Sequence, residues 1–178
     1  MRETPNPRGG QLRRVSTITA VTGIALTLIA PAAGAAGRGG WTPYRTQPFD
    51  SAGRCSFTVH GDIVKDEEEI RTVAAFPDGT PRIQEFRGPL VIRFTNTSNG
   101  RSAVRDVSGY GRLRTLADGG SVWFFDGGAS IGVPIGNTAF PAGSYIVHGR
   151  FRLTIAPDGT RDLPHLHAHV ENLCDTLG

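Results

Sequence analysis

The dipeptide Asp-Gly recurs along this chain and limits what it can fold into. It occurs at residues 78–79, 118–119, 126–127 and 158–159, between segments rich in apolar and β-branched residues. Asp-Gly is a strong hairpin signal, because a two-residue type I′ turn needs a positive φ at both central positions. Beyond Cys55 no segment shows a convincing helical period. The pattern therefore predicts an all-β domain whose strands are joined by tight turns.

The segments between the turns predict about ten strands. Those strands lie near residues 54–60, 69–76, 82–87, 89–97, 101–108, 111–116, 121–126, 130–137, 145–156 and 165–174. Short connections favour an antiparallel up-and-down barrel, in which each strand pairs with the next one along the chain. A β-sandwich of ten short strands remains the alternative.

Residues 1–36 predict a cleaved signal peptide of the general secretory type. Arginines precede an apolar run from Val15 to Ala30, and small residues follow as far as Ala36, where we expect cleavage. A charged segment, an apolar segment and an Ala-x-Ala-like site make up such a signal. The apolar run has sixteen residues, whereas a helix needs about 20 to span a bilayer. We therefore expect a secreted, extracellular protein without a stable membrane anchor.

Cleavage changes the charge of the protein. The whole chain has nineteen basic and sixteen acidic residues, and removing residues 1–36 leaves fifteen of each. A neutral domain gives no electrostatic reason to expect nucleic acid as a partner. The remaining chain has the usual size of one domain. We expect an irregular lead-in over residues 37–54 and a single β domain over residues 55–178.

The two cysteines, Cys55 and Cys174, lie near the two ends of this domain. In an exported protein an even pair predicts a disulfide. If the first and last strands paired with the cysteines opposite each other, His60 would lie opposite His169.

Histidines form a row in the last predicted strand. Residues 165–171 read His-Leu-His-Ala-His-Val-Glu, so in a strand the histidines share one face. A two-residue turn at Asp158-Gly159 would place His148 opposite His169 and Arg150 opposite His167. Together with the cysteine register, this predicts a candidate Zn²⁺ or copper site at His60, His148, His167 and His169.

The same registers also argue against a metal. They place the apolar residues of these strands on the core face, so the histidines point outward, where neighbouring side chains diverge and ligands converge poorly on one ion. We therefore prefer an outer face without a bound metal, and a pH-sensitive contact surface remains a further alternative.

Aromatic residues suggest a different site. We expect the interior or mouth of the barrel near Trp123, Phe125, Tyr110 and Tyr145 to hold a small apolar ligand, as barrels of this size can.

Phosphate-loop, nucleophile-elbow and His-Glu-x-x-His motifs are missing from the sequence. The preferred hypothesis is a binding or structural module. The alternatives are a metal-dependent enzyme using the histidine row and a cell-surface interaction protein. The sequence leaves the oligomeric state open.

Several turn and strand-end motifs carry a resemblance that covers Cys55 to Leu177. They are Cys55-Ser56-Phe57, Phe94-Thr95-Asn96, Gly100-Arg101-Ser102, Val107-Ser108-Gly109, Asp118-Gly119-Gly120, Gly149-Arg150-Phe151 and Leu173-Cys174-Asp175-Thr176-Leu177. In these motifs the chain resembles a group of small secreted bacterial proteins of uncharacterised function. The resemblance implies a β-barrel-like architecture and brings no activity with it.

Overall fold

The computed structural model describes residues 40–164 and 167–178. In this part of the chain the structure is antiparallel β with one short helix, α1 (Leu173–Leu177), so the predicted all-β class is confirmed. Among these residues no helix is long and apolar enough to cross a membrane. The predicted signal peptide lies outside the described residues.

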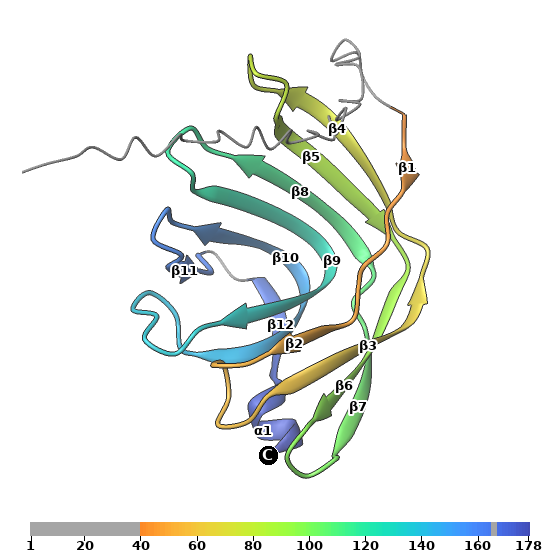
Figure 1. Cartoon of the computed structure of the whole chain (residues 1–178), viewed down its shortest axis with the longest axis vertical. Helices are drawn as coiled ribbons and strands as arrows, with labels where there is room; N and C mark the ends of the chain where they lie inside the picture. Colours follow the sequence, from red (N-terminus) through yellow and green to blue (C-terminus); the bar gives the residue numbers. More distant parts are fainter. Residues whose placement is uncertain (1–39, 165–166) are drawn as a thin grey trace, which may run out of the picture. The chain divides into compact units, whose positions relative to one another are not determined.

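The strands form two sheets (Figure 1). The larger sheet has the order β1-β4-β5-β8-β9-β10-β11, and β12 also pairs with β10. Its strands are β1 (Thr42–Pro43), β4 (Glu69–Ala75), β5 (Pro81–Gly88), β8 (Gly109–Thr115), β9 (Ser121–Val133), β10 (Gly143–Ile155), β11 (Arg161–Asp162) and β12 (His167–Asn172). The smaller sheet has the order β2-β3-β6-β7. Its strands are β2 (Phe49–Ser51), β3 (Val59–Asp66), β6 (Leu90–Asn96) and β7 (Ser102–Asp106).

The predicted closed barrel is wrong, because neither sheet closes on itself and the chain passes between the two sheets. After β5 the chain enters the smaller sheet as the β6–β7 hairpin and returns to the larger sheet with β8. Only Pro89 separates β5 from β6, so this connection looks like a hairpin in the sequence. Gly88 has a φ of 128°, and proline has no N–H to donate to a ladder. The chain therefore changes sheets here, and the two-sheet alternative describes the fold better.

Two predicted strands merge into the long strand β9, so Asp126-Gly127 is not the expected turn. At this point a row of paired glycines crosses the larger sheet, made of Gly88, Gly109, Gly127 and Gly149. Both β9 and β10 curve strongly in Figure 1. Glycine inside a strand often marks such a bend or a close approach of two backbones. We call these four residues the glycine row.

The other three Asp-Gly pairs do form hairpin loops, but not of the predicted two-residue type. The Phe76 N–H donates to the Thr80 carbonyl at 2.8 Å, and the Gly79 N–H donates to the Phe76 carbonyl at 3.0 Å. Gly79 has a φ of 88°. This is a three-residue loop, a type I turn followed by a left-handed glycine. The same bonds recur around Gly119 and Gly159.

The apolar side chains form two buried clusters. One contains Val59, Phe94, Ile146, Leu173 and Leu177. The predicted disulfide is present beside it, with the Cα atoms of Cys55 and Cys174 5.3 Å apart. The second cluster is formed by β9, β10 and the residues that cover them, and includes Val133, Val147, Phe151, Leu153 and Leu163.

Candidate functional site

A cavity of about 740 Å³ is bordered by residues of both sheets. Five consecutive residues of β9, 128–132, line it. Successive side chains of a strand point to opposite faces of the sheet, so a cavity on one face is bordered only by alternate residues. A cavity bordered by consecutive residues therefore lies along the edge of the strand. The β8–β9 ladder ends at Gly127, whereas β9 continues beside β10 as far as Val133. The cavity thus lies where β9 has lost its β8 neighbour.

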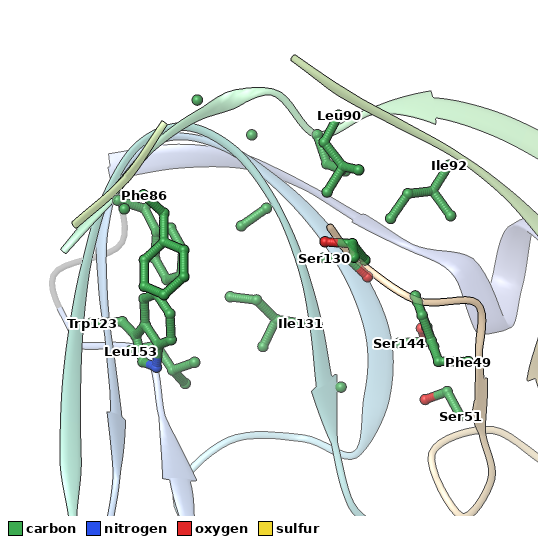
Figure 2. Close-up of a pocket in the computed structure, with 18 of the residues that line it drawn as sticks. Phe49, Ser51, Phe86, Leu90, Ile92, Trp123, Ser130, Ile131, Ser144 and Leu153 are labelled. Atoms are coloured by element: carbon green, nitrogen blue, oxygen red, sulfur yellow. The ribbon is translucent and has the colours of Figure 1, made fainter. Parts of the chain in front are cut away.

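One end of the cavity is aromatic. Figure 2 shows Phe86 of β5, Trp123 of β9 and Leu153 of β10 gathered at this end. The ring centroids of Phe86 and Trp123 are 5.3 Å apart. Phe125 stacks on Trp123 at 5.3 Å, with 6° between the ring planes. These rings form an apolar wall, which we call the aromatic end.

The other end carries serine side chains and two arginines. Ser51, Ser130 and Ser144 lie there, on the opposite side of Ile131 from the aromatic end (Figure 2). Arg54 and Arg161 also line the cavity, and both lie against Gly132. Arg161 Nη1 donates to the Gly132 carbonyl, and Arg54 Nε is 2.9 Å from where a Cβ on Gly132 would lie. We call this region the polar end.

In the described part of the chain, neither arginine forms an ion pair with the two acidic residues that line the cavity, Asp50 and Glu68. Arg54 Nη1 donates to the Ala52 carbonyl at 2.7 Å, but its buried Nε has no hydrogen-bond partner in the described structure. Burial lowers the pKa of Arg161, and the charge of Arg54 adds to this effect. Asp50 accepts from His60 Nδ1 at 2.7 Å. Glu68 accepts from the Thr46 hydroxyl at 2.7 Å, and burial raises its pKa.

Three of the four aromatic residues expected at a ligand site border this cavity. They are Trp123, Phe125 and Tyr110. Tyr110 also borders a second, open groove with Phe124. Tyr145 instead belongs to the second buried cluster, and its hydroxyl donates to the Pro141 carbonyl at 3.1 Å.

The histidine row is only partly as expected. His148 lies opposite His169, and Arg150 opposite His167, so this predicted register is confirmed. His165 lies outside the described residues. The predicted register is right although the predicted two-residue turn is wrong. The loop around Gly159 has three residues, and the register of the strands paired with β10 shifts by one residue between β11 and β12. The two deviations compensate.

The register based on the disulfide is wrong, so His60 is not beside His169. β3 pairs with β2 and β6, whereas β12 pairs with β10. Cys55 precedes β3 and Cys174 lies in α1, so the bridge is not a cross-strand pair and sets no register. His60 instead contacts Asp50 and Asp62 at 2.7 and 3.2 Å. Its hydrogen bonds to Asp50 and then Asp62 raise its pKa.

Within residues 40–164 and 167–178, no group of three or more His, Cys, Asp or Glu side chains is arranged to hold a metal ion.

Glu171, at the end of the histidine row, forms an ion pair with Arg105 of the smaller sheet. Arg105 Nε and Nη2 donate to its two oxygens at 2.6 and 2.7 Å. The Thr176 hydroxyl donates to it at 2.8 Å. The pKa of Glu171 is lowered, chiefly by Arg105.

We predict that this ion pair makes stability depend on acid pH. The folded pKa of Glu171 lies below its ordinary value of 4.5, so its contribution is present above that value and is lost as the pH falls through the folded pKa. Glu171→Gln should lower the free energy of unfolding by about 1 kcal/mol at pH 7. The difference should shrink toward pH 3 in urea unfolding measured at both pH values. A constant difference would contradict the assignment.

Comparisons of the chain with protein-family models, curated proteins and solved structures found no match.

The structure brings in two site residues that the sequence analysis did not identify, Arg54 and Arg161. Arg54 ends the predicted lead-in, and Arg161 follows an Asp-Gly loop. Nothing in the sequence around either residue distinguishes it from an arginine on the solvated surface. Only their common contact with Gly132 reveals them, and that contact depends on the path of β9 after the glycine row.

Proposed function

We propose that this domain binds a small, largely apolar molecule in the cavity along β9, and that it does so as a secreted protein. The observation that carries the proposal is the cavity itself, with its volume of about 740 Å³ and its aromatic end. Binding sites for small molecules have volumes of about 300–1,000 Å³ and are lined mainly by apolar and aromatic side chains with a few polar groups. The cavity matches this description in both size and lining.

The aromatic end supports an apolar ligand in particular. Trp123 packs against both Phe86 and Phe125, yet none of the three is fully buried. All three line the cavity, and an apolar molecule placed against them would remove apolar surface from water. Such burial contributes about 25 cal/mol per Å². The Cys55–Cys174 disulfide is consistent with a protein that works outside the cell.

Filling the cavity tests the proposal. Ser130 lines it (Figure 2), so Ser130→Phe should occupy space that a ligand needs. We expect the wild type to bind the neutral fluorophore N-phenyl-1-naphthylamine saturably, and Ser130→Phe to bind it at least about tenfold more weakly. The readout is the rise in probe fluorescence during a titration.

Ser102→Phe is the matched control, because Ser102 is exposed in β7 and does not line the cavity. It adds the same ring and should bind the probe like the wild type. The proposal is wrong if the folded wild type shows no saturable binding of this probe or of 1-dodecanol, or if Ser130→Phe binds both as the wild type does.

A further inference from the structure

We infer that the ligand is a single-chain lipophilic carboxylate, whose charged group binds between Arg54 and Arg161 at the polar end of the cavity. This inference rests on the proposed function, because it specifies the chemistry of a molecule bound in the same cavity.

Two arginines from distant parts of the chain converge on one glycine of β9. Arg54 follows β2 and Arg161 lies in β11, yet both contact Gly132 of β9. Gly132 has no side chain, and a Cβ there would lie 2.9 Å from Arg54 Nε and 3.5 Å from the Ser51 hydroxyl oxygen. An added methyl group would crowd Arg54 Nε and would be in ordinary van der Waals contact with the Ser51 hydroxyl. Glycine at this position therefore lets the Arg54 guanidinium pack directly against the backbone of β9.

Neither of the two arginines at the polar end, Arg54 and Arg161, has an ion-pair partner among the described residues. Partly buried cations are costly when no anion compensates them. Arg54 Nε is buried without an acceptor, and the lining carboxylates of Asp50 and Glu68 bond to His60 and Thr46. A bound anion would compensate the charge of the two guanidinium groups.

The lining of the cavity changes from apolar to polar along its length. Figure 2 places Phe86, Trp123 and Leu153 at one end and Ser51, Ser130 and Ser144 at the other, with Ile131 between them. A chain lying past Ile131 would cover the aromatic end and bring its head to the arginines. Guanidinium groups present a planar fork of donors that fits the two oxygens of a carboxylate. The serine hydroxyls can donate further hydrogen bonds.

The test compares two probes of equal chain length, dodecanoate and 1-dodecanol. Isothermal titration at pH 8 measures each against the wild type, Arg54→Gln, Arg161→Gln and the control Arg114→Gln. Arg114 is an exposed arginine of β8 that does not line the cavity. We expect the wild type and the control to bind dodecanoate at least about tenfold more tightly than dodecanol. Each cavity variant should lose most of this preference while binding dodecanol unchanged.

Unchanged dodecanol binding shows that a variant is folded and that its cavity is intact. Arg54→Gln is the decisive variant, because Arg161 also donates to the backbone of β9 and its loss can disturb the strand. Equal binding of both probes by the wild type would overturn this inference and leave the proposed function standing. A preference for dodecanoate that persists in Arg54→Gln would overturn it as well. If neither probe binds the folded wild type, the proposed function itself fails.

Discussion

Gly149→Ala is expected to destabilise the domain by about 3 kcal/mol or more, because the position excludes any side chain. Gly149 has a φ of 136°, which L residues rarely adopt. A Cβ there would also lie 2.7 Å from the His167 carbonyl oxygen and 3.0 Å from Ala168 Cα. Both contacts are with the backbone of β12, which cannot yield without losing its pairing to β10. Urea unfolding followed by tryptophan fluorescence measures the loss.

Gly136→Ala is the matched control for this prediction. Gly136 also has a positive φ, 87°, but a Cβ there meets nothing within 4 Å. It should therefore show only the cost of the left-handed backbone, about 1 kcal/mol. Equal losses for the two variants would show that the close approach of β10 and β12 at the glycine row does not constrain the fold.

Removing the disulfide should have the largest effect on stability. The bridge joins Cys55, which precedes β3, to Cys174 in α1 across a sequence separation of 119 residues. A cross-link that closes so long a loop restricts the unfolded chain, and the chain-entropy model gives a stabilisation of about 5 kcal/mol. We expect the double variant Cys55→Ala/Cys174→Ala to lose about 4–5 kcal/mol in urea unfolding.

The wild type with its disulfide reduced is the control for the double variant. Both lack the cross-link, so the two should unfold at similar urea concentrations, well below that of the oxidised protein. A double variant as stable as the oxidised wild type would contradict the assigned role of the bridge.

The strands could be predicted from the sequence, but the way they join into sheets could not. Alternation and turn residues report local backbone geometry, and they located most of the strands. The connection through Gly88-Pro89 has the length of a hairpin, yet it carries the chain from one sheet to the other. At Asp126-Gly127 a turn signal lies inside a strand, because the pairing of β9 with β10 continues through Gly127 and Gly149. Pairing partners determine both outcomes, and local sequence does not encode them.

The same distinction explains the candidate site. Trp123 and Phe125 could be found because large aromatic residues two apart in a strand lie on one face. The polar end could not be found, because Arg54 and Arg161 meet only through the Gly132 backbone. The proposed pairing of His60 with His169 failed for a related reason. It treated the disulfide as a cross-strand pair, whereas Cys174 lies in α1.

Trp123 lines the cavity along β9, so its fluorescence can report directly whether this cavity takes up an apolar chain. The chain has two tryptophans, Trp41 and Trp123, so Trp41→Phe leaves the aromatic end as the only source of tryptophan fluorescence. Bromine quenches tryptophan at close range. Titrating this variant with a bromine-labelled dodecanoate should quench Trp123 saturably at one ligand per chain, and adding Ser130→Phe should raise the ligand concentration needed for quenching at least about tenfold. Quenching that rises linearly without saturation, and equally in both proteins, would contradict uptake of an apolar chain by this cavity.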